Sequence, residues 1–123
     1  MTEELVTLET AKLLKEKGFN EPCMIAMNIE DGRQYGTNRT NSELPIKVCS
    51  HPTQSVTQKW LRETKNLHIE IYRNACGYGY AIVKADSGTW MEDDNFKGPN
   101  DGGNWDTYEE ALEAGIQEAL KLI

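Results

Sequence analysis

Acidic and amide side chains gather near the end of the chain at a spacing that resembles a calcium-binding loop. Asp93, Asn95, Gly98 and Asp101 occupy positions 1, 3, 6 and 9 of an EF-hand-like register, where oxygen ligands and a sharp turn are needed. Position 5 is a lysine, which cannot coordinate a cation, and position 12 is Asn104 instead of a bidentate glutamate. The pattern therefore favours a solvated turn, and we predict no metal and no cofactor.

A cysteine and two histidines offer a second kind of chemistry. Cys49 and His51 lie close in sequence, and with His68 they resemble a zinc site or a Cys–His nucleophilic pair. No Cys-x-x-Cys spacing supports zinc. We expect His51, which precedes Pro52 at a helix start, to cap that helix, and His68 to lie on the wetter face of a strand.

A glycine and tyrosine repeat, Gly77 to Tyr80, resembles a fragment of a phosphate-binding loop. Phosphate loops lie between a strand and a helix N-terminus, whereas this segment falls between two predicted strands, so a tight turn is the better prediction. Aromatic residues are concentrated around the same predicted sheet and its last loop, where they would form either core or an exposed recognition surface: Tyr72, Tyr78, Tyr80, Trp90 and Trp105.

Acidic residues dominate the segment from Glu92 to Glu118, which contains a single lysine. Such a surface suits a basic partner or mimics nucleic acid, although acidic residues in a first helical turn also stabilise the helix dipole. The residues that we select as a possible partner surface are Trp90, Glu92, Asp93, Asp94, Asp101, Trp105 and Asp106.

Composition sets the wider bounds. The 123 residues include 13 basic and 20 acidic side chains, a net charge of −7, and a length typical of one domain, so we predict a single domain over 1–123. The negative charge disfavours direct nucleic-acid binding. Three widely spaced cysteines argue for a reducing compartment, and no apolar run is long enough for a membrane span, so we expect a cytoplasmic protein.

Three segments have helical patterns. The first is Leu8 to Lys17, with Thr7 as N-cap and Gly18 at the left-handed C-terminal position. The second opens at Pro52 and Thr53 and ends near Asn66. The third runs from an N-cap at Thr107 to the end of the sequence, with Glu110 placed to return a hydrogen bond to the cap. The second and third helices each have a predicted apolar face. On the second helix this face consists of Val56, Trp60, Leu61 and Thr64. On the third helix it consists of Leu112, Ile116, Ala119, Leu120 and Ile123.

Between the helices the pattern changes to that of strands. An Asp31-Gly32 turn predicts a two-residue hairpin between 24–30 and 33–37, with Glu30 opposite Arg33. The segment 38–43 is polar and predicts a surface loop. Alternation predicts strands over 67–72, 78–84 and 89–92, with turns at 74–77 and 86–88. The order α-β-β-α-β-β-β-α predicts an α+β fold, an antiparallel sheet with three helices packed on it.

All three helical segments resemble a group of small uncharacterised proteins carried by prophages and mobile elements of gut anaerobes. The resemblance rests on residues 9–19, on 52–55 running into 60–63, and on 107–115. Most of these residues are caps and apolar contacts, so the resemblance implies a shared scaffold. The group has no known activity, and no functional residue follows from it.

The function that the sequence favours is a small, non-enzymatic, phage-type accessory protein that binds a host protein through its surface. An inhibitor of a host defence protein, or a nucleic-acid mimic that uses the Glu92–Glu118 region, is the alternative. A small hydrolase is less well supported because no convergent polar site is evident. The oligomeric state stays open.

Overall fold

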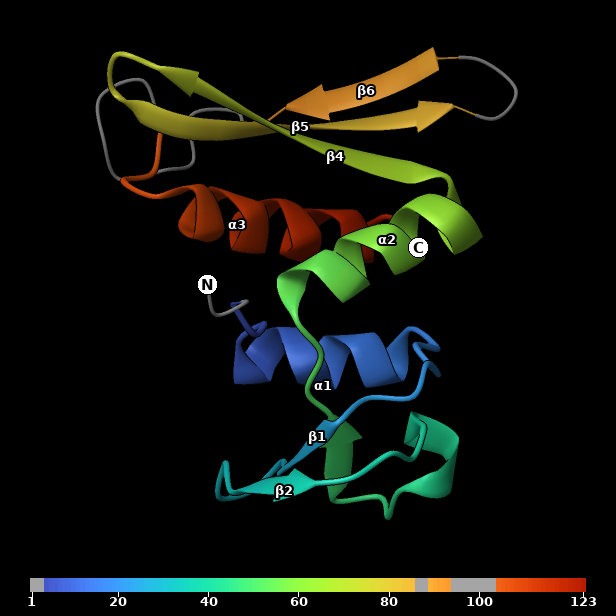
Figure 1. Cartoon of the computed structure of the whole chain (residues 1–123). Coiled ribbons are helices and arrows are strands. Elements are labelled where there is room, and N and C mark those ends of the chain that lie inside the picture. The colour runs from blue at the N-terminus through green and yellow to red at the C-terminus, as the bar shows by residue number, and fades with distance from the viewer. Residues whose placement is uncertain (1–3, 86–88, 94–103) are drawn as a thin grey trace. The chain divides into compact units, whose positions relative to one another are not determined.

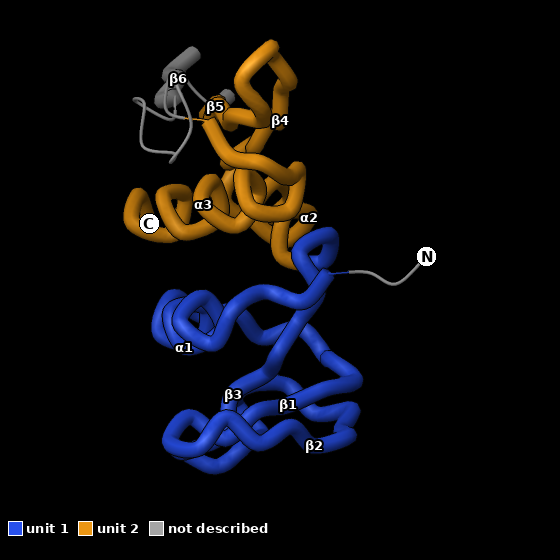
Figure 2. Tube along the Cα trace, turned by 90° about the vertical axis from the view of Figure 1, so that its left-hand side faces the viewer, with its two compact units in different colours: residues 1–56 blue, residues 57–123 orange. Residues whose placement is uncertain are grey.

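The computed structural model describes residues 4–85, 89–93 and 104–123, with the backbone alone for 85 and 89–93. The chain divides into two compact units, residues 1–56 and 57–123, coloured separately in Figure 2. The prediction of a single domain stays a prediction.

Helix α1 (Leu8–Glu16) begins and ends as its sequence predicts. Oγ1 of Thr7 accepts a hydrogen bond from the N–H of Thr10 at 3.3 Å. At the other end Gly18 adopts φ +93°, and the N–H of Phe19 donates to the carbonyl of Leu14 at 2.9 Å. This pair of features is a Schellman ending, which a glycine at the left-handed position permits. Phe19 is buried, so the stop signal also contributes to the core.

Strands β1 (Ile25–Asn28), β2 (Gln34–Gly36) and β3 (Val48–Ser50) form an antiparallel sheet in the order β2-β1-β3, with α1 on one side (Figure 1). The register pairs Ala26 with both Tyr35 and Ser50, and Met27 with Cys49. Because paired residues share a face, Met27 and Cys49 lie on one face and Ala26 on the other. Helix α1 contacts β3, the Cys49 and Met27 side chains are buried, and Lys12 and Lys15 of α1 lie near the Cys49 thiol, so α1 covers the Cys49 face.

The predicted two-residue hairpin is wrong. The N–H of Asn28 donates to the carbonyl of Arg33 at 2.8 Å, so Asn28 and not Glu30 lies opposite Arg33, and residues 29–32 form a four-residue turn. Oδ1 of Asn28 accepts from the N–H of Glu30 at 2.8 Å, which competes with continued strand pairing. Gly32 adopts φ +74° and closes the turn, while Glu30 forms an ion pair with Lys47 at 3.2 Å.

The polar segment 38–43 is more than a surface loop, because it contains a 3-10 helix, η1 (Asn41–Glu43), and a buried side chain. Nδ2 of Asn41 donates to the carbonyl of Phe19 at 2.7 Å, and its Oδ1 accepts from the N–H of Ser50 at 2.8 Å. One amide therefore connects the end of α1 to the edge strand β3. The sequence did not predict β3.

Helix α2 (Gln54–Lys65) is followed by a meander of β4 (Leu67–Asn74), β5 (Gly77–Ala85) and β6 (Thr89–Asp93), in the order β4-β5-β6. Asn66 links α2 to β4 with φ +56°, as its predicted role as a helix stop requires. Trp60 and Leu61 are buried as predicted. Val56 is 41% exposed and Thr64 is exposed, so those two residues of the predicted face are wrong.

Helix α3 (Tyr108–Lys121) packs against β4 and β5, as Figure 1 shows. Oγ1 of Thr107 accepts from the N–H of Glu110 at 3.1 Å, which confirms the N-cap. The Glu110 carboxylate was predicted to accept a hydrogen bond from the backbone N–H of Thr107. It accepts one from the Thr107 hydroxyl instead, at 3.0 Å. The predicted apolar stripe is buried from Leu112 to Leu120, but Ile123 is 39% exposed.

Among the described residues the helices and strands follow one another along the chain in the order α-β-β-β-α-β-β-β-α. The α+β class is therefore confirmed, with one strand more than predicted and with two sheets in place of one. The pairing of β3 with β1, across a long chain separation, explains the difference.

Candidate protein-binding surface

The structure contradicts the Cys–His nucleophile. Cys49 is fully buried, and burial raises the pKa of its thiol, with the nearby Lys15 and Lys12 opposing only part of that rise. A nucleophilic cysteine needs the opposite shift and an accessible sulfur. The Cys49 thiol is therefore a core group.

His51 has both ring nitrogens engaged, and it does not cap α2. Its Nε2 bonds the carbonyl of Val6, which can only accept, so Nε2 carries the hydrogen. Its Nδ1 then accepts from the Gln34 side-chain amide at 3.0 Å. His51 thus fixes the segment before α1 to the first sheet. The bond from the N–H of Val56 to Oγ1 of Thr53, at 3.2 Å, satisfies the first turn of α2 instead.

Within the residues that the structure describes, no three His, Cys, Asp or Glu side chains gather closely enough to hold a metal ion. The calcium-like register falls almost wholly on residues 94–103, outside the described residues. His68 is half-buried on β4, as expected.

The prediction that the Gly77 to Tyr80 segment is a tight turn is wrong, because these residues begin β5 and the turn lies just before them. Asn74 pairs with Gly77, so the β4–β5 hairpin has a two-residue connection, and Gly77 adopts φ +136°. The segment continues as β5 and does not lead along the chain into a helix, so it lacks the strand–loop–helix arrangement of a phosphate-binding loop.

An aromatic and basic cluster lies where this hairpin meets the start of α3. The guanidinium of Arg73 lies 4.8 Å from the centre of the Tyr78 ring, and Tyr78 meets Tyr108 edge to face, with ring centres 6.1 Å apart. Register places Arg73 opposite Tyr78 on the face that α3 covers. Beneath them, Trp105 packs on the buried Tyr80 with ring centres 5.7 Å apart. Tyr108 itself is 44% exposed.

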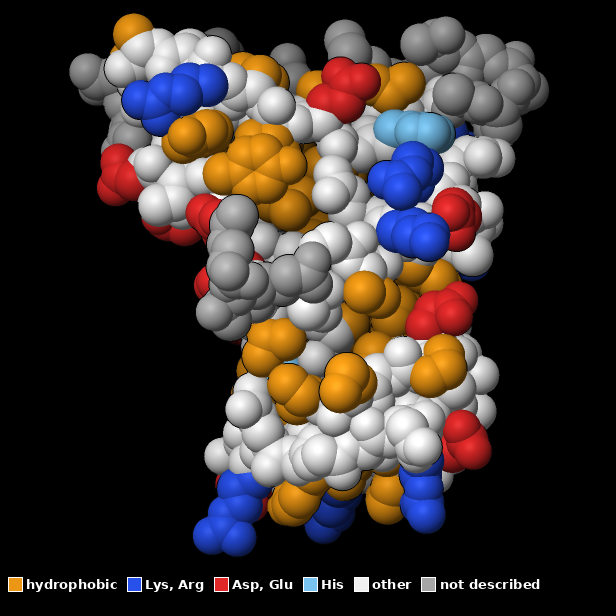
Figure 3. Space-filling model, viewed as in Figure 1, with side chains coloured by type: hydrophobic (Ala, Val, Ile, Leu, Met, Phe, Trp, Pro, Cys, Tyr) orange, Lys and Arg blue, Asp and Glu red, His pale blue; other side chains and the backbone are white. Residues whose placement is uncertain are grey.

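Carboxylates adjoin this cluster. Asp106, Glu109 and Glu110 are all exposed at the beginning of α3. Figure 3 shows hydrophobic side chains flanked by basic and acidic ones at the end of this unit where the hairpin and α3 meet. We call Arg73, Tyr78, Trp105, Asp106, Tyr108, Glu109 and Glu110 the α3 entry surface.

The structure describes the side chains of only two residues of the predicted partner surface, Trp105 and Asp106. Trp105 is half-buried and Asp106 exposed, and both belong to the α3 entry surface. Trp90, Glu92 and Asp93 belong to β6, of which the backbone is described, while Asp94 and Asp101 lie outside the described residues. Sequence reasoning missed Arg73 and Tyr108, although the register of the hairpin would have placed Arg73 beside Tyr78.

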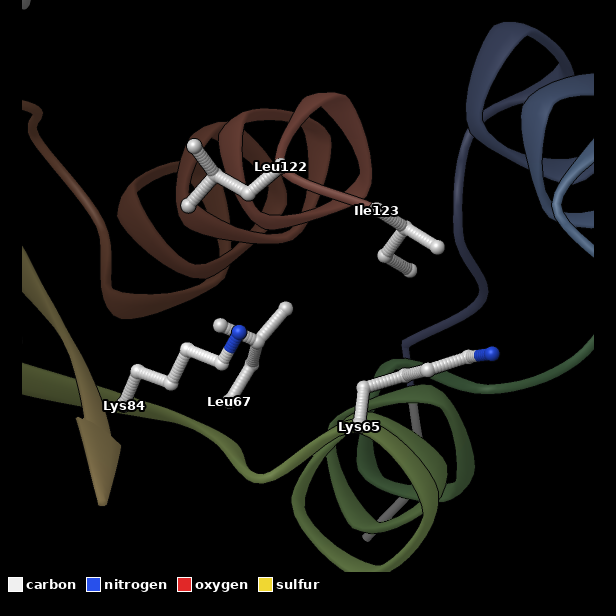
Figure 4. A pocket seen from close by; sticks show the side chains of 5 residues that line it. All are labelled: Lys65, Leu67, Lys84, Leu122 and Ile123. Carbon is white, nitrogen blue, oxygen red and sulfur yellow. The ribbon is translucent and has the colours of Figure 1, made fainter. Parts of the chain in front are cut away.

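A separate hollow of about 450 Å³ lies at the other end of α3. Leu67 and Leu122 approach each other across it, and the ammonium groups of Lys84 and Lys65 lie on opposite sides (Figure 4). The hollow has the size of a ligand pocket, but the described residues that line it offer no convergent set of polar groups.

The chain matches no family model, and comparison with curated proteins and with solved structures gave no significant match. None of the helices in the described parts of the chain combines the length and apolar character needed to traverse a lipid bilayer.

Proposed function

We propose that the protein is a small, non-enzymatic accessory protein of the prophage type that binds a basic host protein through the α3 entry surface. It would act in the cytoplasm, where its free cysteines would stay reduced. The single observation that carries the proposal is the exposed Tyr108 ring, held edge to face by Tyr78 at the acidic beginning of α3.

The chemistry of this surface supports a protein partner. Tyrosine, tryptophan and arginine are the residues that most often dominate the energy of protein interfaces. Here they are held by ring contacts to the sheet, so that little side-chain freedom remains to be lost on binding. The three exposed carboxylates favour a positively charged partner and accelerate its approach.

Capture of a partner from host lysate tests the proposal, with the identity of the captured protein read by mass spectrometry. The wild-type chain should retain a basic protein at low salt and release it at high salt, because exposed charges are screened. Tyr108→Ala should abolish capture. Tyr35→Ala is the matched control, since Tyr35 is 45% exposed but lies in the first unit. Equal capture by both variants, or no capture of a basic protein by wild type, would contradict the proposal.

A second candidate is a nucleic-acid mimic that inhibits a host defence protein. It is favoured by the run of exposed carboxylates at Asp106, Glu109 and Glu110. Double-stranded DNA should then compete with the protein for its partner, and Asp106→Asn with Glu109→Gln should weaken capture more than Glu63→Gln, an exposed carboxylate on α2. If DNA does not compete, the protein binds its partner without mimicking nucleic acid, and the second candidate function is contradicted.

A further inference from the structure

The first unit contains a pocket of about 440 Å³ on the sheet face that α1 leaves uncovered. Ala26, Val48 and Leu44 form an apolar floor, and Tyr35 and Gly36 of β2 line the pocket beside them. Register puts Ala26 and Val48 on the face opposite to Cys49. The wall is the chain that leaves β2 and passes through Thr37, Asn38 and Arg39.

This wall is held in place by hydrogen bonds before any ligand arrives. The N–H of Thr37 donates to the carbonyl of Met24 at 2.9 Å, and the buried Asn41 amide fixes the segment that follows the wall to the end of α1 and to β3. Oδ1 of Asn20 also accepts from the N–H of Ser42 at 2.8 Å. The Glu43 carboxylate accepts from the N–H and the hydroxyl of Thr40, at 3.0 and 3.1 Å. A preformed wall reduces the entropy that a ligand loses on binding.

Of the described residues that line the pocket, only Arg39 is charged. No described carboxylate lies within ion-pair distance of its guanidinium, whereas Lys47 is paired with Glu30. Glu43 is close enough for Arg39 to help lower its pKa, but its carboxylate is already bonded to Thr40. Figure 3 shows Lys and Arg side chains beside hydrophobic ones on the first unit.

We propose that this pocket binds a small organic carboxylate with an apolar body. The guanidinium of Arg39 would hold the carboxylate, because its planar fork matches two carboxylate oxygens. Thr37 and Asn38 add hydrogen-bonding groups at the same wall, and the apolar floor receives the body of the ligand. The size falls within the range of small-molecule sites. This site is independent of the α3 entry surface and of the function proposed for it.

Titration of the full-length ¹⁵N-labelled protein with phenylacetate, followed by amide NMR, tests this inference. Saturable shifts are expected at Thr37, Asn38 and Arg39. Arg39→Gln should weaken binding by at least tenfold. Arg33→Gln is the matched control, because Arg33 is an exposed arginine beside β2 that does not line the pocket, and it should change affinity by less than twofold.

Phenylacetamide, the neutral analogue of the same shape, should bind at least tenfold more weakly than phenylacetate. Leu44→Ala, which removes part of the floor, should weaken phenylacetate while the spectrum retains the dispersion of the folded protein. Absence of saturable shifts at these three amides, equal affinity for the amide analogue, or equal losses in the two arginine variants would each overturn the proposal.

Discussion

The backbone of Gly115 in α3 lies directly against the ring of Tyr80 in β5. A Cβ at position 115 would lie 3.2 Å from Cγ of Tyr80 and 2.9 Å from Cγ2 of Ile69. Because Tyr80 is fully buried, its ring has no free space to move into. The helix therefore approaches the sheet more closely than any side chain at this position allows.

Gly115→Ala tests this contact. Alanine normally favours a helix over glycine by about 1 kcal/mol, but here the clash should outweigh that gain and lower the free energy of unfolding by about 1–3 kcal/mol. Chemical denaturation measures the change. Ala114→Gly, at the half-buried neighbouring position, should cost about 1 kcal/mol from helix propensity alone. A stabilised Gly115→Ala variant would show that α3 packs less closely.

Asn41→Ala should destabilise the first unit by about 2–4 kcal/mol, because it removes bonds to two buried backbone groups. Thermal unfolding followed by circular dichroism measures the loss. Asn38→Ala, at an exposed position of the same segment, should change stability by less than about 0.5 kcal/mol. Similar effects of the two substitutions would refute the anchoring role of Asn41.

Glu43 should titrate below the ordinary glutamate range. Its pKa is lowered first by the backbone bond from Thr40, then by the Thr40 hydroxyl, with Arg39 adding a smaller contribution. A lowered native pKa stabilises the fold above the unfolded pKa, and this contribution is lost as pH falls through the native pKa. Carboxyl ¹³C NMR should show a higher Glu43 pKa in Thr40→Val than in wild type. An unchanged value would show that the hydroxyl bond is not formed in solution.

The three cysteines should differ sharply in reactivity. Cys76 is exposed, whereas Cys23 and Cys49 are buried, and burial raises the pKa of both thiols so that they stay protonated at neutral pH. The nearby Ser50 hydroxyl moderates the rise in the pKa of Cys23. A thiol-specific disulfide reagent should modify one cysteine in the native protein and three in denaturant. Cys76→Ser should remove the native reaction, and rapid modification that persists in this variant would contradict the burial.

Local signals predicted the helix ends well. Thr7, Gly18 and Thr107 act on backbone groups within a few residues of themselves, so their effect can be predicted from the sequence nearby. The alternation over 67–72 likewise predicted β4. Distant pairings were missed. Asn41 is buried only because α1 and β3 meet around it, and β3 is a strand only because β1 lies beside it.

The candidate surface likewise combines residues that could be predicted from nearby sequence with residues that only distant packing brings together. Trp105 and Asp106 were selected from composition near the last helix, and the structure places both on the α3 entry surface. Arg73 and Tyr108 come from a strand and a helix that are separated along the chain. Only the packing of α3 on the sheet brings them to Tyr78.

The β4–β5 hairpin joins eight residue pairs through a connection of only two residues. Its contacts are local, so little loop-closure entropy opposes their formation, and hairpins of this kind form in about 1–10 μs. The pairing of β1 with β3 must first close a much longer stretch of chain. We therefore expect the amides of β4 and β5 to gain protection before those of β3 in pulse-labelling hydrogen exchange during refolding, so that this two-residue turn sets where folding begins.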